Sequence, residues 1–153
     1  MSIPANSSVV IPRLVCRNPA AAVDFCVAVF GATSLGGRPG ADGTLAHALL
    51  TIGGEMLMIE AEWPGFLGPA PTGDGHSPVV IFVYVDDVDG TVERAVAQGA
   101  RVVMPAQNQF WGDRTALIVD PAGHVWTVAT RIEETTEEQR QDRWSGILKE
   151  RNA

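Results

Sequence analysis

The feature that most constrains this chain is a unit of secondary structure that occurs twice. Residues 9–62 and 78–130 each show the pattern of a strand, a helix and three further strands. The two helices begin at Asn18 and Asp87 and end before Gly31 and Gly99. The number of residues between the two helix starts is therefore nearly the same as the number between the two helix ends. A period this long that occurs only twice argues against a solenoid and predicts one domain built from two paired βαβββ modules.

Both expected helices carry start and stop signals. Asn18 is a favourable N-cap and Pro19 fits the first helical position, while Asp87 caps the second helix. Gly31 and Gly99 are suited to the left-handed conformation that ends a helix. Apolar residues recur at helical spacing in both segments, namely Val23, Val27 and Phe30, then Val88, Val92 and Val96.

Alternating and apolar runs predict the strands around these helices. We expect strands at 9–16, 44–52, 55–62, 78–85, 100–104, 115–119 and 124–130, with strand ends and a turn at 34–43. Gly53 and Gly54 predict a hairpin turn. Residues 63–77, with three prolines and four glycines, and residues 107–114 are expected to be loops.

The C-terminal segment differs from both modules. We expect residues 1–132 to form a single domain and residues 133–153 to form a helical tail. Thr135 and Glu138 have the spacing of a capping box, and Trp144, Ile147 and Leu148 form a narrow apolar stripe after them. The stripe fits either a helix that docks on the domain or a partly frayed surface helix.

Composition limits the classes of binding partner and the cell compartment that we expect for this protein. The 153 residues are 46% hydrophobic, which is enough for a real core, and the net charge of -7 disfavours nucleic acid and anionic membranes. The apolar runs are too short to span a bilayer, and the first residues do not resemble a signal peptide. Cys16 and Cys26 are too few for a disulfide framework, so we expect buried, reduced thiols and a cytoplasmic protein.

Four segments, in their order along the chain, resemble one family. They are Ala22–Phe25 with Phe30–Ala32, then Asp86–Asp89, then Phe110–Arg114, and last the turn Asp120–Trp126. This set resembles the PhnB-like branch of the glyoxalase/bleomycin resistance/dioxygenase superfamily, also called vicinal oxygen chelate proteins. The resemblance runs from about residue 10 to residue 130.

The resemblance implies an α+β fold in which two curved, four-stranded mixed sheets form an open cup for a small ligand. Many members of the family are homodimers, and some exchange modules between chains, so a homodimer is expected here. Members include metal-dependent isomerases, lyases and dioxygenases, and others sequester a drug without catalysis. Because a fold does not determine a function, the choice depends on the residues of the cup.

In the enzymes of this family four strand positions hold one divalent ion, and the resemblance maps those positions onto this chain. They fall on Ile11, on Val80, on Thr127, and on either Met58 or Glu60. Aliphatic side chains do not coordinate metals, so at most one of the four positions carries a ligand. We therefore expect no metal cofactor at the usual site.

The three histidines could replace the missing metal ligands only in part. His47 lies in an expected strand and can face the cup, His76 lies in the long loop and is expected to be solvated, and His124 is expected to face away from Thr127. The alternative to a metal-free cup is one divalent ion at a rearranged site formed by His47 and Glu60. Two protein ligands would make such a site weak.

Strand alternation predicts which side chains line the cup. If the four mapped positions face inward, the opposite face, with Leu14, Cys16, Leu57, Ile59, Ile81, Val83 and Trp126, packs under the helices. The inward set is apolar and aromatic with few polar groups, a mix typical of small-molecule sites. The alternative is that these residues only fill the interior. The candidate ligand-binding residues are Arg13, Met56, Met58, Glu60, Phe82, Tyr84, Trp111, Arg114 and Thr127.

Two of these candidates come from the expected loop at 107–114, before the strand at 115–119. Trp111 is suited to stack on a planar ligand, and Arg114 is suited to pair with a carboxylate. The alternative is that Asp113 and Arg114 brace the loop while Trp111 covers the core.

The favoured function is sequestration of a hydrophobic or aromatic small molecule without the usual metal. The first alternative is a metal-dependent isomerase, lyase or dioxygenase with a rearranged site. The second is a metal-free enzyme in which Glu60 or Tyr84 transfers a proton. If the protein is an enzyme, its candidate catalytic residues are Glu60, His47 and Tyr84.

Overall fold

The computed structural model describes residues 3–75 and 77–152 and has the expected α+β architecture of two βαβββ modules and a C-terminal helix. His76 lies outside the described residues. The first module contains β1 (Arg13–Cys16), α1 (Pro19–Phe30), β2 (Thr33–Pro39), β3 (Leu45–Ile52) and β4 (Glu55–Ala61). The second contains β5 (Ile81–Tyr84), α2 (Val88–Ala97), β6 (Arg101–Asn108), β7 (Asp113–Val119) and β8 (Val125–Arg131), and α3 (Glu137–Arg151) follows it.

Each module forms one four-stranded mixed sheet, and the two sheets have the same topology. The strand order is β1-β4-β3-β2 in the first, called sheet A, and β5-β8-β7-β6 in the second, called sheet B. In both, the strand before the helix pairs in parallel with the last strand of the module, and the other pairs are antiparallel. The duplication read from the sequence is therefore a duplication of topology.

The helices begin and end where the local signals predicted. The side chain of Asn18 accepts a hydrogen bond from the backbone N–H of Ala21 at 3.1 Å, and Asp87 caps α2 through the N–H of Gly90 at 3.2 Å. Gly31 ends α1 in the left-handed conformation, with a φ of 65°. Caps of this kind satisfy backbone groups that the helix itself leaves unpaired.

Several strand ends differ from the predicted ones. β1 begins at Arg13 instead of Val9, while β6 extends through Asn108, which leaves only residues 109–112 as the loop before β7. β6 contains Pro105, a residue that lacks the N–H group a central strand needs. Because β6 is the edge strand of sheet B, one of its sides needs no ladder hydrogen bonds and the proline is tolerated.

One hydrophobic core joins the modules. Helices α1 and α2 contact each other, and the ring of Phe30 lies on Trp126 with centroids 4.7 Å apart. The indole N–H of Trp126 donates to Asp120 at 2.8 Å, so its polar atom is satisfied inside the core. Alternation correctly identified the strand residues of this face, of which Leu14, Cys16, Leu57, Ile59 and Trp126 are buried and Ile81 and Val83 are partly buried.

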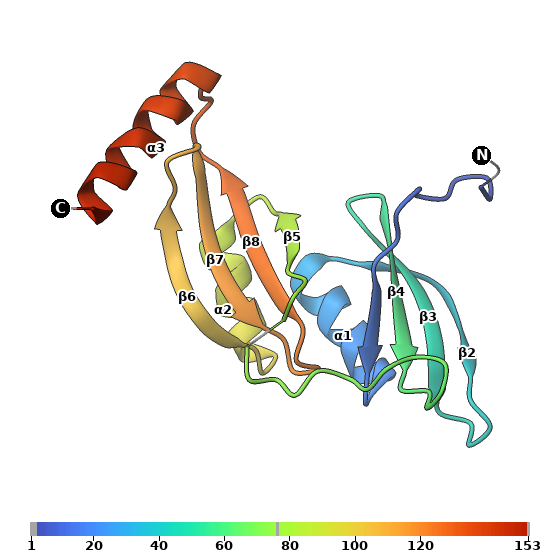
Figure 1. The fold of residues 1–153 in the computed structure, drawn as a ribbon. Helices are drawn as coiled ribbons and strands as arrows, with labels where there is room; N and C mark the ends of the chain where they lie inside the picture. Colours follow the sequence, from blue (N-terminus) through green and yellow to red (C-terminus); the bar gives the residue numbers. More distant parts are fainter. Residues whose placement is uncertain (1–2, 76, 153) are drawn as a thin grey trace.

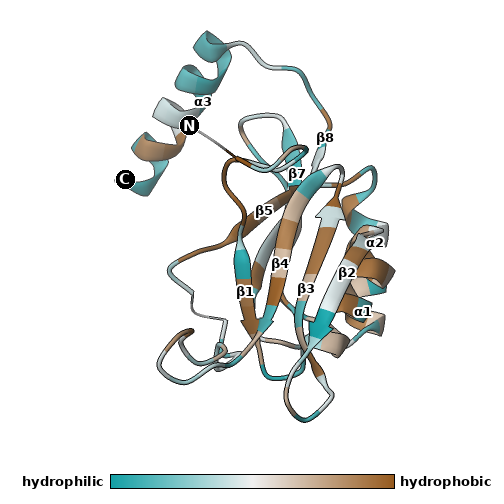
Figure 2. Ribbon diagram, turned by 90° about the vertical axis from the view of Figure 1, so that its right-hand side faces the viewer, coloured by the Kyte–Doolittle hydropathy of each residue, from teal (hydrophilic) through white to brown (hydrophobic). Residues whose placement is uncertain are grey.

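This core determines how the two sheets are oriented. Since the helices of both modules lie in the middle, the other face of each sheet, called its open face, points away from the partner sheet (Figure 1). Figure 2 looks at sheet A and shows hydrophobic segments along β1, β3 and β4. The two sheets do not close on each other, so one chain alone does not form the complete cup.

Helix α3 stands apart from the sheets (Figure 1). Its capping box uses Thr136 and Gln139, one residue later than predicted, because Thr136 is the residue that takes the N-cap conformation. Trp144 packs on Phe110 with centroids 5.4 Å apart, and Arg143 donates to the Phe110 carbonyl at 3.1 Å. The apolar stripe therefore docks at one point and is otherwise partly exposed. None of the helices in the described ranges combines the length and apolarity needed to cross a membrane.

Candidate functional site

The open face of sheet A carries a row of polar side chains, Arg13, Glu60, His47 and Arg38, one from each of its four strands. The strand registers place Arg38 opposite His47 and His47 opposite Glu60. Nδ1 of His47 lies 2.9 Å from Oε1 of Glu60, and a guanidinium nitrogen of Arg13 lies 3.3 Å from the same oxygen. Glu60 is only 8% exposed, so these two contacts compensate a nearly buried carboxylate.

Apolar side chains surround this row. Met58 lies beside Leu49 in the β3–β4 ladder, and Met56 lies beside Thr51. A groove of about 270 Å³ on this face is lined by Leu35, Gly36, Gly37, Arg38, His47 and Leu49. The face thus combines adaptable methionines with a few charged groups that can orient a ligand.

The open face of sheet B is aromatic. Phe82 and Tyr84 are 48% and 56% exposed, and their ring centroids are 5.2 Å apart. Thr127 lies beside Phe82 in the β5–β8 ladder. Large exposed rings at alternate positions of one strand form a surface that favours contact with another apolar or aromatic group.

A buried carboxylate outside the predicted ligand-binding residues holds this aromatic surface in place. Asp113 is fully buried, and its Oδ2 accepts hydrogen bonds from the Trp111 indole at 2.7 Å and the Tyr84 hydroxyl at 2.9 Å. Its Oδ1 accepts no hydrogen bond from the described residues but lies 3.0 Å from Nε of Arg131. The alternation of side chains along β7 could have indicated this position, because it places Asp113 on the same face of the sheet as Thr115.

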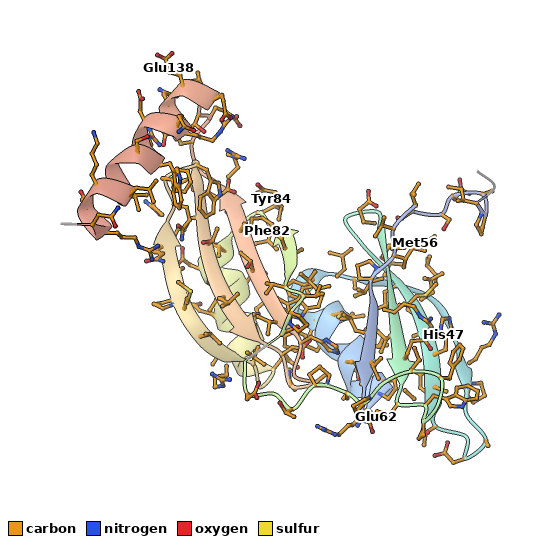
Figure 3. All side chains as sticks on the ribbon, viewed as in Figure 1. His47, Met56, Glu62, Phe82, Tyr84 and Glu138 are labelled. Atoms are coloured by element: carbon orange, nitrogen blue, oxygen red, sulfur yellow. The ribbon has the colours of Figure 1, made fainter. Side chains whose placement is uncertain are left out.

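Predicted residues of the two faces meet in one place, a groove of about 510 Å³ between the modules. It is lined by Met56 from β4 and by Phe82 and Tyr84 from β5, which lie on its two sides (Figure 3). The buried core residues Leu57 and Trp126 lie at the base of its lining. Arg13, Met58 and Glu60 of sheet A do not line this groove, and neither do Thr127 of sheet B and Trp111 of the loop before β7.

Arg114 does not join the other candidates. It lies on the helix side of β7, where its guanidinium makes two hydrogen bonds of 2.8 Å and 2.9 Å with the carboxylate of Asp89. These bonds lower the pKa of Asp89 and raise the pKa of Arg114. The geometry matches the bracing alternative, so we leave Arg114 out of the proposed site.

The remaining histidine and the cysteines lie in the interior between the modules. His124 Nε2 is 2.9 Å from the carbonyl of Val15, and this contact links the β7–β8 turn to β1. Burial, with a further contribution from Asp120, raises the pKa of both Cys16 and Cys26 to about 12. Both thiols are therefore protonated at neutral pH and do not act as nucleophiles.

The polar side chains on the open face of sheet A do not suit the divalent ion that enzymes of this fold family bind. Glu60 and His47 are adjacent, but the guanidinium of Arg13 lies against the same carboxylate oxygen and would repel a cation. In residues 3–75 and 77–152 no group of three or more His, Cys, Asp or Glu side chains is arranged to hold a metal. Two donors with a neighbouring positive charge make a poor metal site.

The chain is similar to several proteins of known sequence. Uncharacterized proteins of Mycobacterium bovis and Mycobacterium tuberculosis are 40% identical to it over 133 residues. This match covers 85% of the chain, together with 88% of the first relative and 78% of the second.

Solved structures show the same fold. TioX from Micromonospora sp. ML1 is 35% identical, with a TM-score of 0.64 over 82% of this chain and 100% of TioX. The fosfomycin resistance protein FosX from Listeria monocytogenes, solved with Mn(II) and sulfate, is 17% identical. Its TM-score is 0.61 over 90% of this chain and 98% of FosX, a likeness that concerns the fold alone.

The model of one protein family matches most of the chain. The match covers residues 8–128, which include both modules as far as β8. The matched region contains the duplicated βαβββ topology and both open faces. The chain belongs to the glyoxalase/bleomycin resistance protein/dioxygenase superfamily.

Proposed function

We propose that this protein binds and sequesters a hydrophobic or aromatic small molecule, without the metal ion that enzymes of its family use. The observation that supports this most is the pair of open faces, one with Met56 and Met58 beside a charged row and one with exposed aromatic rings. The arrangement offers apolar contact area and a few orienting polar groups. Among the described residues it includes no group of three side chains suited to hold a catalytic metal.

We further propose that the protein is a homodimer in which sheet A of one chain faces sheet B of the other, so that each cup contains both open faces. The exposed apolar side chains on or beside these faces support this, because monomeric proteins seldom leave large contiguous apolar patches in water. Those that are more than one third exposed include Leu35, Val80, Phe82, Tyr84, Val103 and Met104.

Binding of the neutral fluorescent probe N-phenyl-1-naphthylamine tests the binding function. We expect saturable binding, with affinity lowered about tenfold or more in Phe82→Ala and in Trp111→Ala, because each loses an aromatic contact surface. Val96→Ala is the matched control, because Val96 on α2 is 49% exposed, nearly the same as Phe82. Equal affinity in wild type and both aromatic variants would contradict the proposal.

Sedimentation analysis tests the dimer. We expect a dimer in solution, and we expect Phe82→Arg to shift the equilibrium towards the monomer because it places a charge in the proposed interface. A monomer that binds the probe with one full site per chain would show that the cup does not need a second copy.

Elemental analysis of protein purified without chelator separates sequestration from the enzymatic alternative. Less than about 0.1 equivalent of metal, with none retained after soaking and desalting, is the expected result. About one equivalent, lost in Glu60→Ala, would favour a metal-dependent isomerase, lyase or dioxygenase over our proposal.

Two finer assignments accompany this proposal. We place the chain in the PhnB-like branch of the superfamily, on the motifs at Asp86–Asp89, Phe110–Arg114 and Asp120–Trp126. We infer a reducing, cytoplasmic setting from the two buried, free thiols.

A further inference from the structure

We propose that the open face of sheet A carries a subsite for the carboxylate group of an aromatic acid, formed by Arg38 and His47. This inference rests on the proposed function and names the chemical class of its ligand. The aromatic body of the ligand lies against the apolar part of the cup, and its acidic group lies at the charged row of sheet A.

The strand register places the two residues of the subsite side by side. Arg38 on β2 is directly opposite His47 on β3, and residues at opposing positions of antiparallel strands project from the same face. Both line the groove of about 270 Å³, together with Leu35 and Leu49. A ligand in this groove therefore meets a guanidinium, an imidazole and two leucines at once.

The contact with Glu60 orients the imidazole of His47. Oε1 of Glu60 lies 2.9 Å from Nδ1 and is also paired with Arg13 at 3.3 Å. A carboxylate paired in this way accepts hydrogen bonds, so Nδ1 carries the hydrogen and donates it. Nε2 has no partner among the residues that the structure describes. An imidazole that carries hydrogens on both ring nitrogens donates from each, so Nε2–H is the group of His47 that can donate to a ligand oxygen.

Arg38 supplies the main attraction for an anion. It makes no hydrogen bond or ion pair within the described part of the chain, whereas Arg13 is paired with Glu60. With Arg13, Arg38 and Glu60 counted, the row carries a net positive charge even when His47 is neutral, in a protein with a net charge of -7. An unpaired guanidinium matches the geometry of a carboxylate, which it can bind through two parallel hydrogen bonds.

The neighbours of this pair select an aromatic acid over a small inorganic anion. Leu35 and Leu49 line the same groove, and Met58 lies beside Leu49. A hydrophobic ring gains free energy by covering these side chains, whereas phosphate or sulfate does not. The charged row then places the acidic end of the ligand and fixes its direction in the cup.

The experiment compares two ligands with the same rings, 1-naphthoate and 1-naphthalenemethanol, by titration calorimetry with the full chain. We expect wild type to bind the acid at least tenfold more tightly than the alcohol, because a carboxylate gains charge-assisted hydrogen bonds. Arg38→Gln is expected to weaken the acid about tenfold and leave the alcohol unchanged. His47→Gln is expected to reduce the same preference.

Arg151→Gln is the matched control, because it removes one exposed arginine at the end of α3, outside the residues that line the groove. It is expected to change neither affinity. Equal affinity for acid and alcohol, or equal losses of both in Arg38→Gln, would overturn the subsite and leave sequestration in place. Binding of neither compound would contradict both the subsite and the proposed function.

Discussion

The two modules share one topology but differ in the chemistry of their open faces. Both faces hold a buried carboxylate, Glu60 in sheet A and Asp113 in sheet B. Glu60 is paired with His47 and Arg13, side chains that also reach the surface of the face. Asp113 instead accepts hydrogen bonds from Trp111 and from Tyr84, whose ring forms the aromatic surface together with Phe82.

This difference shows how a duplicated fold can acquire two roles. The alternation of apolar residues that builds each sheet is the same in both modules and determines the packing under the helices. The few polar residues on the open faces are free to differ, because they do not contribute to that core. Sheet A is suited to orient charge, and sheet B is suited to present fixed aromatic rings.

The largest expected effect concerns the two carboxylates. We expect Asp113→Ala to lower the free energy of unfolding by about 2–4 kcal/mol, because it removes two hydrogen bonds and an ion pair at once and leaves a cavity where the fully buried carboxylate was. Glu60→Ala is expected to cost about 1–2 kcal/mol, since its partners can reach water. Urea unfolding of both variants checks this order. A larger loss in Glu60→Ala than in Asp113→Ala would reverse the comparison.

Two glycines with positive φ test the rigidity of the same faces. Gly112, with a φ of 98°, precedes Asp113, and a Cβ there would collide with the carbonyl of Glu133, whereas Gly54 in the β3–β4 turn, with a φ of 89°, has open space around it. We expect Gly54→Ala to cost about 1 kcal/mol from backbone strain alone. Gly112→Ala is expected to cost about 2–3 kcal/mol because the collision adds to that strain.

Binding of N-phenyl-1-naphthylamine distinguishes the two glycine variants further. Gly112→Ala is expected to weaken the probe because it displaces Trp111, and Gly54→Ala is expected to leave the affinity unchanged. Equal unfolding free energies and affinities in the two variants would show that the 109–112 loop is not rigidly held.

A third difference between the modules concerns how stability responds to alkaline pH, because the first module holds both cysteines. An unfolded cysteine loses its proton near pH 9, whereas Cys16 and Cys26 keep theirs to about pH 12. The unfolded state therefore binds fewer protons in this window, and the free energy of unfolding falls as the pH rises from about 9 towards about 12. Urea unfolding at pH 8 and pH 10 measures this fall, and the double variant Cys16→Ala/Cys26→Ala should show less of it.

The smallest expected effect is at Arg114. Its ion pair with Asp89 lies at the protein surface, so Arg114→Ala should change stability little, and less still at high salt. Because that pair lowers the pKa of Asp89, its small contribution is present at neutral pH and is lost as the pH falls through the lowered pKa. Affinity for 1-naphthoate should stay unchanged in Arg114→Ala. A loss similar to that in Arg38→Gln would return Arg114 to the binding site.

Much of the fold follows from signals that lie close together in the sequence. Asn18, Gly31 and Asp87 set helix ends through contacts within a few residues, so their roles could be predicted directly. Strand alternation correctly separated the buried Leu57 and Ile59 from Met56 and Met58. The capping box of α3 was displaced by one residue because Thr135 and Thr136 offer nearly equivalent signals.

The candidate site was less predictable, because it depends on residues that are far apart in the chain. The sequence did not indicate that Asp113 would accept hydrogen bonds from Trp111 and Tyr84, since Tyr84 is 29 residues away. Nor did it indicate that Arg114 would reach Asp89, 25 residues away, instead of the cup. Such contacts arise only once the strands of sheet B are placed side by side and α2 is packed on the sheet.

The sequence by itself determined the duplicated modules, the helix ends and the face that most strand residues occupy, because periodicity and capping are local properties. Only the tertiary structure decided how the two sheets are turned relative to each other. Phe30 of one module packs on Trp126 of the other, and this contact places the helices between the sheets. Non-local burial of apolar surface, which no short sequence window records, therefore points the open faces apart.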